Sequence, residues 1–195
     1  MIVKAIITDF DGTLVDTFEA NYEAYMLAFK RYYYEIGYGL TREQYQACFG
    51  LRFDAFMDYM KVNDEELRDR IKKEKARVYP MCYRSLKLNN VLISFIKGSK
   101  ATGVKIAIAS TAQRNNLMNV LNYFNLAELF DLIIAGDAVK AGKPNPEIYS
   151  TSMTLLNVKP DETLIFEDSE VGLQAAEASG ANYIKISEAF FDSNK

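Results

Sequence analysis

The sequence predicts an α/β fold in which a parallel sheet is interrupted, soon after its first strand, by a helical insertion. From residue 84 onward, short apolar stretches alternate with helical patterns, which is typical of a parallel sheet covered on both faces. A similar apolar stretch, Ile2–Ile7, opens the chain, whereas residues 17–83 show helical periodicity only. The opening strand has no partner among these helices, so we expect it to join the later strands.

The opening stretch is β-branched and short, as expected of a buried strand in a parallel sheet. It leads into Asp9 and Asp11, followed by Gly12, at the strand end where open α/β sheets bind ligands. Two carboxylates this close repel each other, which indicates a cation between them or one raised pKa. A polar turn that ends the strand is the alternative for an isolated Asp-x-Asp.

The insertion contains aromatic residues and methionines at helical spacing, which we interpret as core packing. The two faces are Tyr22, Tyr25, Met26 and Phe29, and then Phe53, Phe56, Met57 and Met60. Residues 64–77 are charged almost throughout and predict a solvated helix with complementary ion pairs. Gly37 and Gly39 mark a loop between helices.

The remainder of the chain predicts alternating helices and strands. We expect strands at 104–109, 132–135, 163–166 and 183–186, and helices at about 85–101, 112–123, 146–156 and 170–179. Residues 1–16 and 84–195 would then form a Rossmann-like α/β core, and residues 17–83 an inserted helical domain.

Composition narrows the function classes. The net charge is −3 with no basic stripe, which argues against a nucleic-acid partner. No apolar run approaches the roughly 20 residues that span a bilayer. Because the first strand begins directly at the start of the sequence, we expect no signal peptide. The two cysteines, Cys48 and Cys82, form no disulfide framework. We expect a cytoplasmic monomer.

The chain contains no histidine. This excludes Ser-His-Asp and Cys-His nucleophiles, imidazole metal ligands and histidine general bases. Proton transfer must therefore use carboxylates, lysine or tyrosine.

Polar residues of different types follow the later predicted strands. They are Ser110 and Thr111, then Lys143 between Gly142 and Pro144, and then Glu167 and Asp168. Taken singly, each could be a helix cap or a surface lysine. Together they supply carboxylates for a hard cation, indicating Mg²⁺, and a hydroxyl and an ammonium for a phosphoryl group.

These residues resemble the four motifs of the haloacid dehalogenase superfamily of phosphotransferases. The first motif is similar to Asp9–Thr17, the second to Ser110, the third to Lys143-Pro144 and the fourth to Glu167-Asp168. The stretches 142–149 and 167–172 most resemble the branch of β-phosphoglucomutase and phosphoglycolate phosphatase, in which a helical cap follows the first motif. The resemblance covers residues 1–186.

The resemblance implies a role for each motif residue. Asp9 would be the nucleophile that forms an aspartyl-phosphate, and Asp11 the general acid and base. Mg²⁺ would be held by Asp9, the Asp11 carbonyl and Asp168, with Glu167 as a ligand or just behind the ligands. Ser110, with Thr111, and Lys143 would bind phosphoryl oxygens. The expected enzyme is a phosphatase that hydrolyses a small phosphorylated metabolite.

Two alternatives remain open. A sugar phosphomutase of the same branch would carry a histidine in the first cap helix, where this sequence has Asn21, so hydrolysis is favoured. A phospho-receiver signalling domain uses similar residue types, but it carries its phosphorylated Asp on a central strand and has no inserted cap. Asp16 fits a structural role, and Arg52, between two cap helices, is the candidate for a substrate contact.

Overall fold

The computed structural model describes residues 2–191 and divides into two compact units. The α/β unit comprises Met1–Asp16 and Lys87–Lys195, and the helical unit comprises Thr17–Leu86. The second boundary therefore lies three residues beyond the 83/84 position given by the sequence analysis, because residues 84–86 stay with the helical unit.

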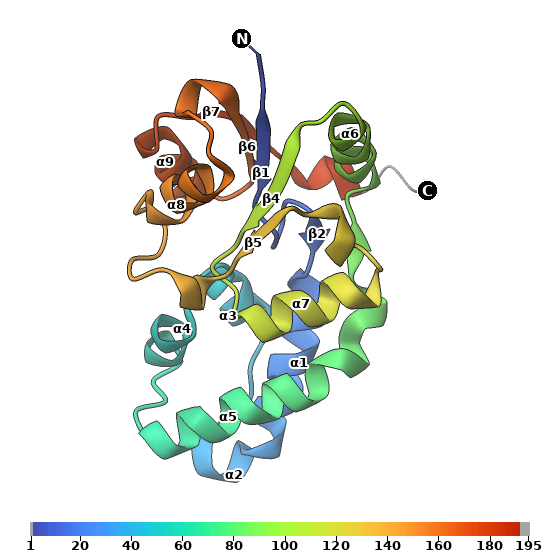
Figure 1. Cartoon of the computed structure of the whole chain (residues 1–195). Coiled ribbons are helices and arrows are strands. Elements are labelled where there is room, and N and C mark those ends of the chain that lie inside the picture. The colour runs from blue at the N-terminus through green and yellow to red at the C-terminus, as the bar shows by residue number, and fades with distance from the viewer. Residues whose placement is uncertain (1, 192–195) are drawn as a thin grey trace. The chain divides into compact units, whose positions relative to one another are not determined.

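The α/β unit is built on a five-stranded sheet in the order β5-β4-β1-β6-β7 (Figure 1). All four neighbouring pairs are parallel, so the prediction of a parallel α/β sheet is confirmed. The strands are β1 (Ala5–Thr8), β4 (Lys105–Ala109), β5 (Leu132–Ile134), β6 (Thr163–Glu167) and β7 (Asn182–Lys185). The first strand of the chain is therefore the central strand of the sheet.

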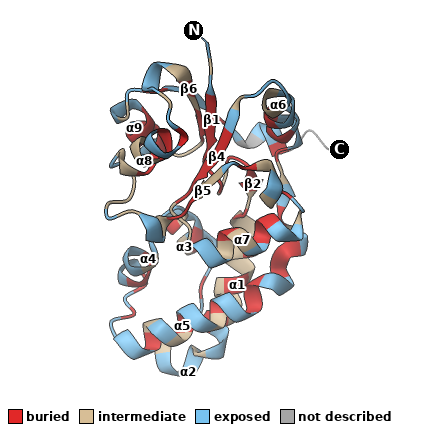
Figure 2. Ribbon diagram, in the orientation of Figure 1, coloured by how far each residue is buried: buried red, intermediate tan, exposed pale blue. Residues whose placement is uncertain are grey.

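Helices cover both faces of this sheet, as Figures 1 and 2 show. They are α6 (Asn90–Ala101), α7 (Arg114–Tyr123), α8 (Glu147–Leu156) and α9 (Glu170–Ala178). Helices α8 and α9 pack on one face, where Ile7 and Ile165 meet Tyr149 in a buried cluster. On the other face, Phe95 of α6 lies with its ring 5.7 Å from that of Phe166. Burial on both faces explains why the three central strands, β1, β4 and β6, are almost continuously apolar.

One expected helix begins later than its periodicity indicates. Residues 79–85 form a 3-10 helix, β3 (Lys87–Leu88) follows, and α6 begins only at Asn90 rather than at residue 85. The cause is Asn89, whose side-chain oxygen accepts a hydrogen bond from the Leu92 amide at 3.0 Å and so caps the helix.

A second, two-stranded sheet lies where the chain leaves and re-enters the α/β unit. Strand β2 (Val15–Asp16) pairs antiparallel with β3, with Asp16 opposite Lys87. The buried Asn89 side chain ties this ribbon to the first loop, because its amide donates to the Thr13 carbonyl at 3.1 Å.

The helical unit, all of which is described, contains helices and no strand. These are α1 (Phe18–Arg31), α2 (Tyr33–Ile36), α3 (Arg42–Cys48), α4 (Phe53–Tyr59), α5 (Glu65–Val78) and the 3-10 helix Tyr79–Ser85. As predicted, Phe56, Met57 and Met60 are buried. In α1, however, the most buried positions are Ala20, Ala24, Ala28 and Phe29. The small alanines allow close packing. Of the predicted face, Phe29 is buried in the core as expected, whereas Tyr22, Tyr25 and Met26 are half-buried.

Among the described residues, the helices are all too short or too polar to cross a lipid bilayer.

Candidate active site

The register of the sheet brings two acidic strand ends to the same level. Thr8 at the end of β1 is paired with Phe166 of β6, which places Asp9 beside Glu167. Thr8 is also paired with Ile108 of β4, whose continuation carries Ser110. The chain adds strands on one side of β1 and later on the other, so this edge is the topological switch point where α/β sheets bind ligands.

Lys143 joins the two acidic strand ends. Its ammonium donates to Asp9 Oδ1 at 2.5 Å and to Glu167 Oε2 at 2.6 Å. The three side chains are 4%, 8% and 1% exposed, respectively, so this is a buried ion-pair cluster. The sequence-predicted Lys143 is thus held in place by two carboxylates from different strands.

Both oxygens of the Glu167 carboxylate accept hydrogen bonds. Its Oε1 accepts from the amides of Asp168 and Ser169 and from the Ser169 hydroxyl, at 3.1, 3.0 and 2.8 Å. Its Oε2 accepts from Lys143 and from the Tyr149 hydroxyl, the latter at 2.5 Å. Five donors fix this carboxylate at the N-terminus of α9, where the helix dipole also favours a negative charge.

Gly172 makes the close approach of Glu167 to α9 possible. A Cβ atom at position 172 would lie 2.0 Å from the Glu167 carboxyl carbon, which is shorter than any real contact. Ser169 caps the same helix by accepting from the Gly172 amide at 3.1 Å. The helix-capping interpretation of this segment is therefore correct, and it coexists with the carboxylate cluster.

Asp168 is held from the other side by the first loop. The buried Thr13 hydroxyl donates to Asp168 Oδ1 at 2.7 Å. Gly12 has a left-handed backbone (φ +84°), and a Cβ there would lie 2.2 Å from Asp168 Oδ2. The glycine after the Asp-x-Asp pair thus serves both the turn and the space for Asp168.

The site holds more negative charge than Lys143 neutralises. Burial, followed by the Glu167 carboxylate, raises the pKa of Asp9 well above its usual value, although Lys143 opposes the shift. Burial also raises the pKa of Asp168, to about 6. Burial alone would raise the pKa of Glu167, but Lys143 and the hydrogen bonds outweigh it and the pKa is lowered.

This charge imbalance fits a bound cation. Asp9, Glu167 and Asp168 each offer a carboxylate oxygen, and the three atoms lie within 4.8 Å of one another. An all-oxygen donor set without histidine or thiolate suits a hard divalent ion such as Mg²⁺. A cation there would favour the charged forms of Asp9 and Asp168, whose pKa values are raised by burial and then by the neighbouring Glu167 carboxylate.

Ser110 and Thr111, the predicted phosphate-binding residues, follow β4, the strand next to β1. Ser110 is buried at the end of β4, and its hydroxyl accepts from the Ala112 amide at 3.0 Å; it is not the cap of α7, which is Gln113. The Thr111 backbone packs tightly against Gly136, where a Cβ would lie 2.3 Å from the Thr111 carbonyl oxygen.

Asp11 lies in the first loop in an isolated bridge with Val15, and is partly exposed. Arg52 belongs to the helical unit, where it is exposed at the N-terminus of α4. Their roles stay predictions.

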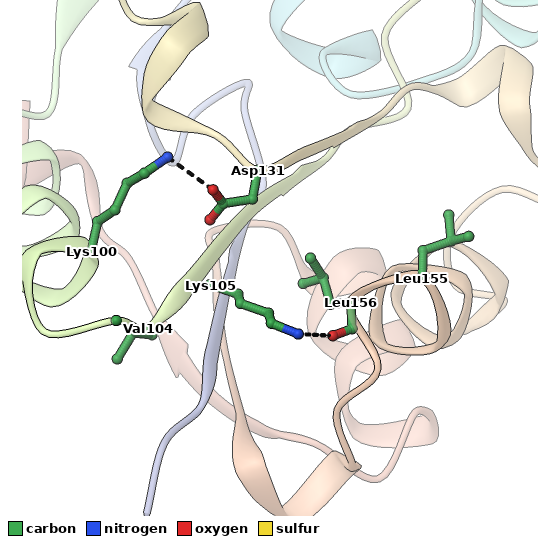
Figure 3. Close-up of a pocket in the computed structure, with 7 residues that line it drawn as sticks. Lys100, Val104, Lys105, Asp131, Leu155 and Leu156 are labelled. Carbon is green, nitrogen blue, oxygen red and sulfur yellow. Dashed lines mark hydrogen bonds and ion pairs between the residues drawn. The ribbon is translucent and has the colours of Figure 1, made fainter.

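A separate pocket, of about 410 Å³, lies at the opposite ends of the strands (Figure 3). It is lined by Lys100, Lys105 and Asp131, among others. The two lysines are bound to protein groups: Lys100 to Asp131 at 3.0 Å and Lys105 to the Leu156 carbonyl at 2.6 Å. It is remote in the fold from the acidic cluster, because Lys105 begins β4 and Ser110 follows its end.

Two residues of the cluster, Thr13 and Tyr149, lie within the motif stretches 9–17 and 142–149 of the sequence analysis, which gives neither of them a role. Each reaches its acidic partner through the fold, across 155 and 18 residues of chain, respectively. Tyr149 has the pattern of an ordinary core residue of α8, and its place at the end of the stretch 142–149, six residues after Lys143, is the signal that could have linked it to the site.

Most of the chain, including every residue of this site, matches a known protein family. The model of the family described as haloacid dehalogenase-like hydrolase matches residues 6–186. The chain belongs to this family. The stretch includes all four acidic, hydroxyl and lysine motifs, so the predicted resemblance is confirmed.

Individual relatives of this hydrolase family agree. The chain is 30% identical to a phosphorylated carbohydrates phosphatase of Thermotoga maritima, over 93% of this chain and 84% of the relative. It is 27% identical to the β-phosphoglucomutase of Bacillus subtilis, over 91% and 80%. The solved structure of CbbY from Rhodobacter sphaeroides in complex with phosphate aligns with a TM-score of 0.84 at 25% identity, covering 100% of this chain and 90% of that one.

These findings confirm that the hydrolase is an enzyme of the phosphatase type with the expected α/β fold. They also remove the phospho-receiver alternative. In receivers the phosphorylated Asp follows a central strand, and here β1, which precedes Asp9, is itself the central strand. Sheet position therefore does not separate the two classes, and family membership does.

Proposed function

We propose that this hydrolase is a Mg²⁺-dependent phosphatase that cleaves a small-molecule phosphate monoester through an aspartyl-phosphate on Asp9. The observation that carries the proposal is the Lys143 ammonium, 2.5 Å from Asp9 within the carboxylate cluster. This arrangement sets a cationic group beside a carboxylate nucleophile, as phosphoryl transfer requires. The phosphatase and phosphate-bound relatives support the same reaction.

In this mechanism, an Asp9 oxygen attacks phosphorus while the bond to the leaving oxygen breaks, and Asp11 gives that oxygen a proton. Asp11 then takes a proton from water, the water oxygen bonds to phosphorus, and the Asp9–phosphorus bond breaks to release phosphate. Lys143 and Ser110 bind the phosphoryl oxygens, and Thr13 keeps Asp168 oriented. Mg²⁺, held by Asp9 and Asp168, would supply positive charge that offsets the negative charge of the phosphate.

We propose that the helical unit acts as the cap of this enzyme and selects the substrate, with Arg52 as a candidate contact. Its location at the end of β2 matches the place where the capped branch carries its insertion. The phosphorylated carbohydrate named for one relative makes sugar phosphates the first class to screen, followed by phosphoglycolate, nucleotides and pyrophosphate.

The metal requirement tests the proposal. Hydrolysis of an aryl phosphate should require Mg²⁺ and stop with excess chelator, because the acidic cluster would otherwise repel the phosphate dianion. Asp168→Asn should weaken Mg²⁺ activation strongly. Full activity in chelator would refute the mechanism.

A sugar phosphomutase is the second candidate, and the likeness to β-phosphoglucomutase favours it. Asn21 in α1 argues for hydrolysis, since it offers no imidazole to align a second hydroxyl. With Mg²⁺ and a sugar 1-phosphate, ³¹P NMR should show free phosphate as the main product. Isomer that accumulates much faster than phosphate would establish the mutase instead.

A further inference from the structure

Tyr149 connects the apolar core of the α/β unit to the charged cluster. Its ring is fully buried among the residues that α8 packs onto the sheet. Its hydroxyl emerges from that core and donates to Glu167 Oε2 at 2.5 Å. The same oxygen accepts from Lys143 at 2.6 Å. A single carboxylate oxygen is therefore shared by the Tyr149 hydroxyl and the Lys143 ammonium.

Because Glu167 Oε2 accepts from both groups, the Tyr149 hydroxyl affects the position of the Lys143 ammonium. Among the described residues, Lys143 donates to Glu167 and to Asp9, which leaves one of its three protons for a phosphoryl oxygen. The two carboxylates compete for this ammonium. A donor from Tyr149 weakens Glu167 Oε2 as an acceptor, so more of the attraction on Lys143 is left to Asp9.

The opposite side of Glu167 cannot compensate for a lost tyrosine donor. Oε1 is already held by two amides and the Ser169 hydroxyl, and Gly172 leaves no room for a shift toward α9. Removal of the Tyr149 hydroxyl would leave a buried lone pair on Oε2, which Lys143 would move to satisfy.

We propose that Tyr149 is a positioning residue: through Glu167, its hydroxyl sets the Lys143 ammonium beside Asp9 for phosphoryl binding. The inference rests on the proposed function of the site. It assigns Tyr149 no contact with the substrate. The Lys143 ammonium also lies 5.0 Å from the centre of the Tyr149 ring, a contact that phenylalanine would keep.

Tyr149→Phe tests this with binding rather than turnover. Calorimetric titration of inorganic phosphate into the Mg²⁺-saturated protein should show a dissociation constant raised roughly tenfold, the size expected for one hydrogen bond to a charged group. The affinity for Mg²⁺ without phosphate should stay within about twofold, because Asp9 and Asp168 are untouched. Ser152→Ala is the matched control: it removes another buried hydroxyl of α8, which donates only to the Ile148 carbonyl at 2.7 Å.

A double substitution separates positioning from simple packing. In a Glu167→Gln background, Tyr149→Phe should weaken phosphate binding no further. The carboxylate through which the Tyr149 hydroxyl acts on Lys143 is already absent there. Wild-type phosphate affinity in Tyr149→Phe, an equal loss in Ser152→Ala, or a full additional loss in the double variant would overturn the inference. Failure of the proposed function would show separately, as wild-type protein that binds phosphate but does not hydrolyse an aryl phosphate.

Discussion

The two units of this hydrolase differ in where their charged side chains lie. In the α/β unit, Lys143 and its two carboxylate partners are buried at the carboxyl ends of the strands. In the helical unit, ion pairs such as Arg70–Glu35 lie at the surface, with side chains 37% and 47% exposed, while the core is aromatic and aliphatic. Burying charges costs stability, so a buried charged cluster is better explained by chemistry than by folding.

The helical unit has one buried cation of its own. Lys75 of α5 lies with its ammonium 3.7 Å from the centre of the Tyr79 ring and 5.2 Å from that of Tyr25. Aromatic faces thus contribute to its surroundings, whereas carboxylates surround Lys143. We therefore expect substitutions in the cluster to affect turnover more than stability, and substitutions of exposed charges in the helical unit to affect neither strongly.

Asp9→Asn should give the largest effect, a complete loss of turnover. An amide cannot form the acyl-phosphate, while removal of one negative charge from an acidic cluster leaves the fold intact. Activity on an aryl phosphate and the thermal unfolding midpoint measure the two halves of the prediction. A midpoint lowered by many degrees would mean that the cluster stabilises the unit, contrary to the comparison.

Asp11→Asn should slow hydrolysis by roughly 10²–10⁴-fold, as expected for a lost general acid and base. The loss should be smaller for aryl than for alkyl phosphates, since a good leaving group needs no proton. Steady-state rates on one substrate of each kind provide the measurement. Equal losses would contradict the acid role.

Gly172→Ala should reduce turnover about 10²-fold, because the new Cβ displaces Glu167 and with it Lys143. Gly98→Ala is its control: position 98 lies within α6 with nothing within 4 Å of a Cβ, and alanine there should stabilise by about 0.5–1 kcal/mol. If both variants keep wild-type kcat/KM, the close approach at Gly172 has no catalytic consequence.

Glu35→Gln should have the smallest effect. The pair with Arg70 is exposed, so its removal should change the free energy of unfolding by less than about 1 kcal/mol, and by less still at high salt. Urea unfolding at low and high salt measures it. A loss above about 2 kcal/mol would show that surface charges do stabilise the helical unit.

Most strands of the sheet, and the positions where they end, can be predicted from the sequence. Hydrophobic periodicity and turn residues predict the bounds of β4, β6 and α9 within a residue or two. The two strands are easily recognised because burial on both faces of the sheet makes their apolar runs continuous. Strands β2 and β3 are only two residues long each, too short to produce a pattern. The alanine face of α1 is missed for another reason: close helix packing selects small side chains, which carry little hydrophobic signal.

The candidate site is predictable where it follows strand ends and not where it depends on tertiary approach. Asp9, Glu167 and Asp168 are recognisable because parallel strands bring their carboxyl ends to one edge. The hydrogen bonds from Thr13 and Tyr149 depend on how a loop and a helix pack. Hydrophobic periodicity does not distinguish a tyrosine whose hydroxyl reaches a buried carboxylate from any other core tyrosine.

The short β2–β3 ribbon makes this enzyme modular. Asp16 and Lys87 face each other across an antiparallel pair, so the two points where the chain crosses between units are only about 5 Å apart. A two-residue hairpin would be long enough to close the α/β unit if residues 17–86 were excised. A foreign insert whose ends lie close together could be grafted at the same place, without altering any residue of the acidic cluster. If the helical unit selects the substrate, as proposed, substrate preference and chemistry can diverge independently by exchange of one continuous segment of the gene.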